Sequence, residues 1–132
     1  MRVSAKAAED AGFDTVLVMD HFYQLPLLGP PDHEMSEAYT LLGALAARTK
    51  TVKLGTLVTG VTYRHPSIFA TQMVTVDHAS HGRLELSLGA AWHDKEHHEL
   101  GIPFPSTSER FDLLEDALEI TTRLMTGERV SY

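Results

Sequence analysis

Three strand-like segments, each separated from the next by a helical one, constrain the fold of this chain more than any other feature. Residues 16–19 form a short apolar run, typical of strands covered on both faces by helices. Residues 52–59 are a second strand, and residues 83–89 are a third, in which leucine alternates with other residues. The connections are long enough to require parallel pairing through right-handed crossovers. The sequence therefore predicts an α/β fold with a parallel sheet.

Four helical segments flank and connect these strands, over residues 5–11, 36–48, 66–81 and 107–126. Pro66 suits the first turn of the third helix, and Gly82 ends it. Ser106 and Glu109 have the spacing of a capping box, which predicts the start of the last helix. That helix should carry apolar side chains on one face: Phe111, Leu114, Leu118 and Met125. Residues 24–35 are rich in proline and are predicted to be a loop.

Composition limits the classes of protein to which the chain can belong. Its 132 residues predict one domain over 1–132, and 43% hydrophobic against 22% charged residues are typical of a globular protein. A net charge of −7 provides no basic surface for nucleic acid or anionic lipid, so neither partner is expected. No apolar run approaches the ~20 residues of a membrane span and no signal peptide is evident, so the expected location is cytoplasmic.

The predicted strands are too few for a closed architecture. A parallel sheet of three strands has two exposed edges, whereas a closed (β/α)₈ barrel needs about 250 residues. This chain has 132 residues, which is about half of that number. The expected sheet therefore lacks strands or shares them with another chain.

Asp20 and His21 follow the first strand directly, at the place where parallel α/β proteins gather catalytic groups. One interpretation is a surface turn in which Asp20 caps the following segment and His21 is solvated. The other is a general base. An imidazole beside a carboxylate, in a pocket shielded from water, can take a proton from a substrate hydroxyl near neutral pH.

Small residues end the third strand, over residues 87–91, just before Trp92. They would let a flat ring or a phosphate approach the backbone, with Trp92 stacked on that ring. Alternatively, they let a helix pack closely, and Trp92 belongs to the core. Glu85 of the same strand either points inward, where it needs hydrogen-bond partners, or is solvated because the sheet is open there.

The string His93-Asp94-Lys95-Glu96-His97 matches the H-x-x-E-H pattern of one class of zinc peptidase. So short a string arises readily by chance among eight histidines, and no distant third ligand can be singled out. We therefore expect a solvated polar turn and no metal site. A zinc-dependent hydrolase is the lesser alternative.

Several short strings occur together along nearly the whole chain: residues 8–14, Asp20-His21-Phe22, residues 54–58, 63–66 and 77–86, Gly89-Ala90-Ala91-Trp92 with Glu96, residues 101–105, and Arg110-Phe111. In this order and spacing they resemble the bacterial luciferase-like monooxygenase family, in particular its branch that uses the deazaflavin coenzyme F420. The resemblance implies a partial (β/α)₈ TIM barrel containing about strands two to four with their helices. The chain thus resembles an N-terminal-half fragment of such a barrel.

The resemblance also implies a site and a chemistry. His21 matches a histidine proposed as general base in the family's deazaflavin-dependent dehydrogenases. The implied cofactor is coenzyme F420 (8-hydroxy-5-deazaflavin), alternatively FMN, and the residues implied to bind it are Asp20, Thr56, Leu57, Val58, Ala90, Ala91 and Trp92. Residues 56–58 match a region where many members have a non-prolyl cis peptide. The implied activity is hydride transfer between the cofactor and a small-molecule substrate, with residues 24–35 on the substrate side.

Departures from the family pattern narrow these implications. Leu25 and Trp92 stand where the sugar-phosphate dehydrogenase members have a tryptophan and an acidic residue, so that specific activity is not implied. Ala91 replaces a common glycine and would be strained at positive φ. The expected protein is an F420- or FMN-dependent oxidoreductase that is inactive as an isolated fragment, and a homodimer or an association with a complementary barrel half is expected. The alternative is a non-catalytic half-barrel that associates with a partner chain.

Overall fold

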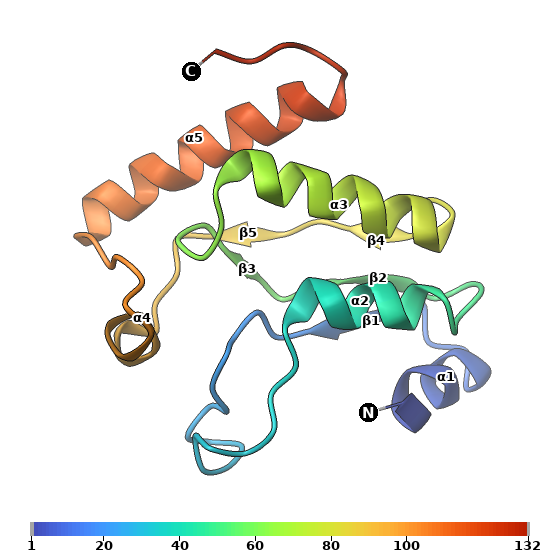
Figure 1. The fold of residues 1–132 in the computed structure, drawn as a ribbon. Helices are drawn as coiled ribbons and strands as arrows, with labels where there is room; N and C mark the ends of the chain where they lie inside the picture. Colours follow the sequence, from blue (N-terminus) through green and yellow to red (C-terminus); the bar gives the residue numbers. More distant parts are fainter. Residues whose placement is uncertain (1, 132) are drawn as a thin grey trace.

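Helices and strands alternate along the chain, as Figure 1 shows. The computed structural model describes residues 2–131. The elements in chain order are α1 (Arg2–Asp10), β1 (Thr15–Val18), α2 (Ala38–Ala46), β2 (Lys53–Thr56), β3 (Thr59–Gly60), α3 (Pro66–Ser80), β4 (Leu84–Glu85), β5 (Leu88–Gly89), α4 (Asp94–Leu100) and α5 (Thr107–Met125). The four predicted helices are confirmed as α1, α2, α3 and α5, whereas α4 lies where a polar turn was expected.

The described strands form two small parallel sheets. β1, β2 and β4 lie side by side in that order, with Val18 opposite Thr56 and Gly55 opposite Glu85. β3 pairs with β5 in the second sheet, where Thr59 lies opposite Leu88. Every pairing among these strands is parallel, which confirms the predicted α/β class.

The last two predicted strands are each divided in two, into β2 and β3 and into β4 and β5. A cis peptide bond joins Leu57 to Val58 in the first gap. In the second gap, the Ser87 hydroxyl donates to the Thr56 carbonyl at 2.5 Å, and the Ser87 carbonyl accepts from the Thr59 N–H at 2.9 Å. A side-chain hydrogen bond thus replaces part of the backbone ladder, which the apolar periodicity does not predict.

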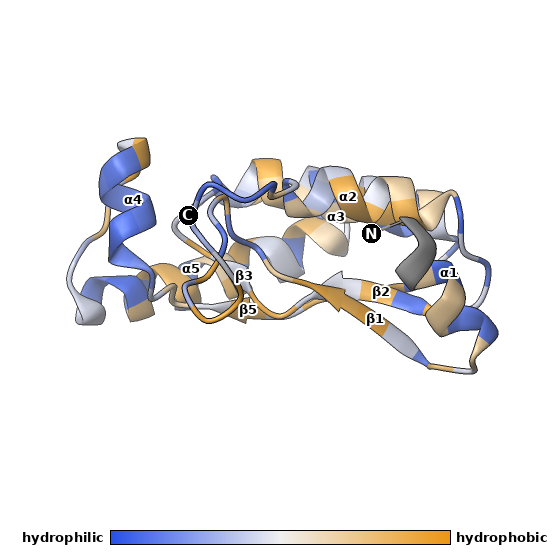
Figure 2. Cartoon of the chain, turned by 90° about the horizontal axis from the view of Figure 1, so that it is seen from below, coloured by the Kyte–Doolittle hydropathy of each residue, from blue (hydrophilic) through white to orange (hydrophobic). Residues whose placement is uncertain are grey.

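The hydrophobic core lies between the sheet and helices α2 and α3, which cover one of its faces (Figure 2). Leu42 of α2 and Leu54 of β2 are fully buried, and Met73 of α3 packs with them. On the opposite face no described helix covers β1 and β2. Leu17 of β1 is accordingly 43% exposed. The sheet is therefore packed on one side only.

Helix α5 packs on α3 through small residues. Ala117 and Thr121 are buried, because small side chains let two helices approach closely. The apolar face predicted from periodicity lies largely outside the core, and Phe111 on it is 59% exposed. Helical spacing therefore predicted an apolar face of α5, but three of its four side chains are exposed and do not belong to the core.

Two charged side chains fasten the loops at the amino ends of the strands. The Arg83 guanidinium donates to the carbonyls of Ala46 and Val52 and to Thr49, over distances of 2.7 to 3.1 Å. The Glu9 carboxylate accepts from three consecutive backbone amides just before β2, and these bonds lower its pKa to about 2. Hydrogen bonds from side chain to backbone thus hold this end of the sheet.

The helix ends carry the predicted signals. The Ser106 hydroxyl accepts from the Glu109 N–H at 3.4 Å, and the Glu109 carboxylate accepts from the Ser106 N–H at 2.9 Å, which confirms the capping box. α3 begins at Pro66 and ends at Ser80, followed by His81, whose φ is 58°, and by Gly82. None of the described helices combines the length and the apolar character that a membrane span needs.

Candidate functional site

A cleft of about 300 Å³ opens at the carboxyl ends of the strands. The segment after β1, the β2–β3 connection, and β5 with the turn that follows it supply most of its lining. The lining residues are Asp20, His21, Leu57, Val58, Gly60, Tyr63, Gly89, Ala90, Ala91 and Trp92. Every predicted site residue except Thr56 is among them. The structure therefore brings together, in one space, side chains that the sequence places on three separate strands.

Thr56 lies beneath the cleft and not in its lining. Its side chain is buried, and its hydroxyl bonds to that of Thr59 at 2.7 Å. The Thr59 hydroxyl in turn bonds to that of Tyr39 at 2.7 Å. This chain of hydroxyls satisfies polar groups that would otherwise be buried without partners. Thr56 can support the floor of the cleft, but it does not face a ligand there.

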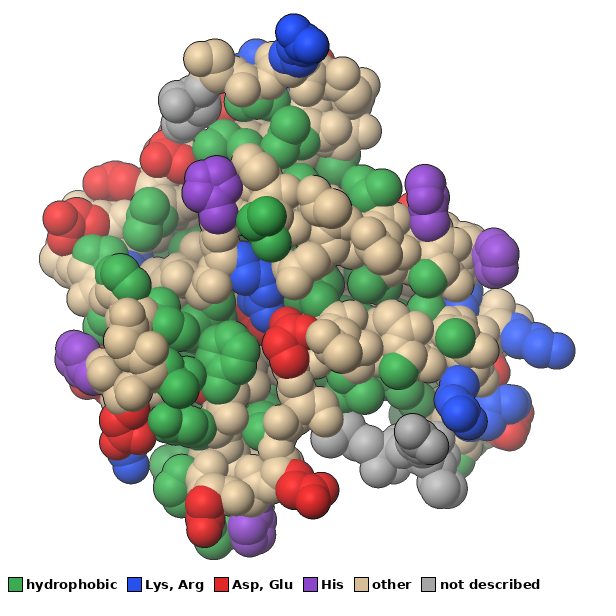
Figure 3. Space-filling view, in the orientation of Figure 1, with side chains coloured by type: hydrophobic (Ala, Val, Ile, Leu, Met, Phe, Trp, Pro, Cys, Tyr) green, Lys and Arg blue, Asp and Glu red, His purple; other side chains and the backbone are tan. Residues whose placement is uncertain are grey.

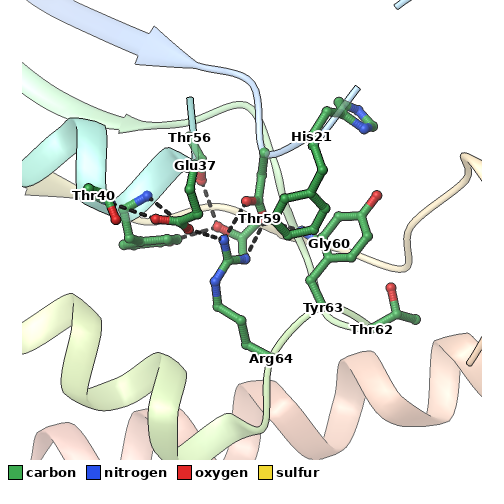
Figure 4. Close-up of polar contacts among 12 residues, drawn as sticks. His21, Glu37, Thr40, Thr56, Thr59, Gly60, Thr62, Tyr63 and Arg64 are labelled. Carbon is green, nitrogen blue, oxygen red and sulfur yellow. Dashed lines mark hydrogen bonds and ion pairs between the residues drawn. The ribbon is translucent and has the colours of Figure 1, made fainter. Parts of the chain in front are cut away.

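Asp20 is only 3% exposed and is held by an arginine. Arg64 donates to its two carboxylate oxygens at 2.7 and 2.8 Å, the Gly60 N–H donates at 3.0 Å, and Glu37 accepts from Arg64 at 2.5 Å (Figure 4). Burial alone lowers the pKa of Arg64, but the bonds to Asp20 and Glu37 outweigh it and raise that pKa. Asp20 therefore belongs to a buried ionic network, and its interpretation as part of a surface turn is wrong.

His21 lies in the wall of the cleft, with Nδ1 2.9 Å from Oε2 of Glu96. Glu96 is fully buried, and its carboxylate also accepts from the Tyr63 hydroxyl at 2.7 Å and from the backbone N–H groups of Phe22 and Tyr23. Burial alone raises the pKa of Glu96, but these bonds outweigh it and lower the pKa to about 2. Burial and the neighbouring carboxylate raise the pKa of Tyr63, so its phenol stays protonated. An imidazole in such surroundings can exchange protons through Nε2.

The segment with the zinc-like string is helical from Asp94 onward, and three of its five residues are buried, so the prediction of a solvated polar turn is wrong. Glu96 and His97 of α4 are fully buried, and hydrophobic side chains gather around this helix (Figure 3). Nδ1 of His97 donates to the His93 carbonyl at 2.8 Å, Nε2 bonds to the Thr62 hydroxyl at 2.6 Å, and the ring stacks on Tyr63. Neither nitrogen of His97 is therefore free for a metal. Within residues 2–131 no three metal-ligating side chains cluster.

The floor and rim of the cleft are flat and apolar. A side-chain carbon at Gly89 would come within 2.7 Å of Val58 Cγ2, so the Val58 side chain can pack against the backbone there only because position 89 is glycine. Ala91 has a φ of 59°, which confirms the left-handed conformation considered for it. Trp92 is 63% exposed and contacts the His21 ring edge to face, with centroids 5.7 Å apart. The interpretation of Trp92 as a core residue is wrong, and this surface can accept a planar ring.

Sequence reasoning missed Tyr63, Arg64 and Glu96 as parts of the site, and Glu85 proves to lie outside it. Tyr63, Arg64 and Glu96 all occur in the strings on which the family resemblance depends, which was the signal available, but spacing alone assigned them no role. Glu85 is partly exposed and pairs with Lys53 at 2.6 Å, as the open-sheet alternative for it predicted.

The fold and the position of the cleft are those of proteins built on the (β/α)₈ barrel, whose sites lie at the carboxyl ends of the strands. The whole chain, residues 1–132, matches the family described as luciferase-like monooxygenase. The chain therefore belongs to the luciferase-like monooxygenase family, and the predicted partial barrel is confirmed.

Individual relatives match this chain over part of their own length. It is 38% identical over 126 residues to an F420-dependent glucose-6-phosphate dehydrogenase of Microbacterium testaceum, covering 95% of this chain and 36% of that protein. It is 33% identical over 128 residues to a 5,10-methylenetetrahydromethanopterin reductase of Archaeoglobus fulgidus, covering 96% and 34%. A solved F420-dependent secondary alcohol dehydrogenase, in complex with an F420-acetone adduct, superposes with a TM-score of 0.78 at 29% identity, covering 93% and 36%. The chain thus spans about a third of the length of these proteins.

Proposed function

We propose that this chain is the part of a luciferase-like oxidoreductase that holds the tricyclic ring of coenzyme F420, or alternatively of FMN, beside His21. The shared cleft carries the proposal, because His21, Val58 and the turn from Ala90 to Trp92 border one apolar space at the carboxyl ends of the strands. The F420 dependence of the similar glucose-6-phosphate and secondary alcohol dehydrogenases supports F420. FMN carries a ring of the same shape.

The residues present fit the ring of such a cofactor but not its phosphate tail. A volume of about 300 Å³ is at the lower end for small-molecule sites. Leu57 and Trp92 present exposed apolar surface, and Gly89 lets the Val58 side chain pack against the backbone of the cleft. Two arginines contact lining residues of the cleft, and both are already bound: Arg64 to Asp20 and a second carboxylate, and Arg110 to the carbonyls of Ala90 and Pro105. We infer that the tail is bound by parts of the barrel that this chain does not contain.

The chemistry proposed for the site divides between cofactor and protein. When bound, the ring exchanges a hydride with a carbon atom of a small organic substrate. In the oxidative direction, His21 accepts the substrate's hydroxyl proton at Nε2 as the hydride leaves the carbon bearing that hydroxyl. A carbonyl forms, and the two electrons leave with the hydride. In the reductive direction the same nitrogen returns the proton, and residues 24–35 border the substrate.

Ring binding can be tested on the chain as it stands. The ¹⁵N-labelled protein is titrated to millimolar concentration with riboflavin and with the deazaflavin ring compound that lacks the phosphate tail. We expect NMR shifts confined to cleft residues, including the Trp92 indole, and their loss in Gly89→Val, whose side chain would meet Val58. Gly43→Ala is the matched control, since nothing lies within 4 Å of a carbon added there. Absent shifts, or shifts on another surface, would contradict the proposal.

The assignment of His21 as base needs a complete barrel, built by joining this chain to the remaining strands of a relative. His21→Ala should lower kcat about 10²–10⁴-fold, the usual contribution of a general acid–base group, and change cofactor affinity little. Equal losses of turnover and of affinity would remove the base assignment and leave His21 as a binding residue.

The uncovered face of the sheet supports a second, non-catalytic candidate. β1 and β4 are the free edges of their sheet, and Leu17 is exposed on its open face. Such edges pair readily with another chain, either a second copy or a complementary half-barrel. Sedimentation at increasing concentration tests association with a second copy, and we expect a dimer. A stable monomer at high concentration would contradict self-association.

A further inference from the structure

We infer that Glu96 is a positioning residue that determines which nitrogen of His21 carries the proton, so that Nε2 faces the cleft as a proton acceptor. The inference rests on the proposed function, because it concerns the group through which His21 would move a proton. Two observations carry it. Nδ1 of His21 lies 2.9 Å from Oε2 of Glu96, and Glu96 is fully buried although His21 itself reaches the cleft.

The bonding around Glu96 leaves one arrangement of protons. Oε1 accepts from the N–H groups of Phe22 and Tyr23, and Oε2 accepts from His21 and from the Tyr63 hydroxyl. A carboxylate has acceptor sites for about four such donors and nothing to donate when ionised. The His21 nitrogen that faces Glu96 must therefore carry the proton. In the neutral ring, Nε2 is then the acceptor that a substrate meets.

The rings around His21 hold this orientation without competing for Nε2. Tyr63, Trp92 and His93 contact the His21 ring edge to face, with centroids at 6.5, 5.7 and 5.8 Å. Among the described residues none forms a hydrogen bond to His21 Nε2. These three ring contacts resist a flip of the imidazole, while Glu96 determines the tautomer.

The substitution Glu96→Gln separates positioning from a merely structural role. Glutamine keeps the size of the side chain and an oxygen for the two backbone amides. Its –NH₂ group replaces Oε2 and donates to His21 Nδ1, which moves the ring proton to Nε2. Tyr63→Phe is the matched variant, because it removes a donor to the same oxygen but leaves the carboxylate in place.

The experiment is two-bond ¹⁵N–¹H NMR on the labelled 132-residue chain at pH 8, with the His21 signals assigned by their loss in His21→Asn. We expect the Nδ1–H form of His21 to dominate at least about tenfold in the unmodified chain and in Tyr63→Phe, and the ratio to reverse in Glu96→Gln.

Three results would overturn the inference: Nε2–H as the main form in the unmodified chain, Nδ1–H retained in Glu96→Gln, or a reversal in Tyr63→Phe. The unmodified chain decides the question even if Glu96→Gln fails to fold. Failure of the ring titration described above would leave the tautomer result intact, so the two proposals fail separately.

Discussion

Replacing Ala91 by glycine should stabilise the protein, because Ala91 adopts a backbone conformation that favours glycine. Its φ is 59°, and a residue with a Cβ pays about 1–2 kcal/mol in this region. Glycine removes that cost but gains freedom in the unfolded chain, which offsets about 0.4–1 kcal/mol. The expected net gain is about 1 kcal/mol. With a urea slope of about 1–3 kcal/mol per molar, the unfolding midpoint should rise by roughly 0.3–1 M.

The assay is urea unfolding followed by the fluorescence of Trp92, the one tryptophan, and by circular dichroism. His81→Gly is the control, since His81 has a φ of 58° at the exposed end of α3, far from the cleft lining. Both variants should raise the midpoint, and only Ala91→Gly should also alter the ring titration. A lower midpoint for Ala91→Gly would show that its Cβ contacts outweigh the backbone term and would refute the reasoning.

Three further predictions concern the buried groups around the cleft. His93→Phe should stabilise the fold by about 1 kcal/mol in urea unfolding, because both ring nitrogens of His93 are buried and have no hydrogen-bond partner among the described residues. His97→Phe breaks two hydrogen bonds and should destabilise the fold by about 2 kcal/mol. Equal effects of the two substitutions would contradict this account. Gly89→Ala should lower the midpoint, since its Cβ would meet Val58 at 2.7 Å, and an unchanged midpoint would show that Val58 moves freely. The pKa of Glu96 is about 2 in the fold against 4.5 ordinarily, so its contribution of about 3 kcal/mol is complete above pH 4.5 and is lost as the pH falls toward 2. Urea midpoints measured across that window should fall less steeply in Glu96→Gln.

The sequence could predict that residues from three strands come together in one site, because this follows from the topology of the sheet. Parallel strands joined by crossovers present their carboxyl ends at one edge, so residues after each strand must meet there. Asp20, Val58 and Ala90, which the family resemblance implies as cofactor-binding residues, lie at or just beyond the ends of the three predicted strands, and they line one cleft. Helix boundaries were equally accessible, since proline, glycine and capping residues act within one turn of their own position.

The contacts that hold the site could not be predicted, because they join residues far apart in the sequence. His21 meets Glu96 across 75 positions, and Asp20 meets Arg64 across 44. The polar string around Glu96 carries no apolar periodicity, and it is buried only because backbone amides, a phenol and an imidazole from other segments supply donors. A local sequence pattern shows how many polar atoms a segment has, but not whether distant residues will supply hydrogen-bond partners for them.

The Arg83 guanidinium and its backbone carbonyls lie at the end of the sheet opposite to His21. The hydrogen bonds of Arg83 and the cleft proposed to bind the cofactor therefore lie at opposite ends of the same strands. Substitutions in the cleft lining can change which ligand binds there without weakening the hydrogen bonds at the other end of the sheet. Ligand specificity can therefore evolve without loss of fold stability. Conversely, a lysine at position 83 could not reproduce the fork of donors that Arg83 provides, and such a change would weaken the fold while leaving every side chain of the cleft lining in place.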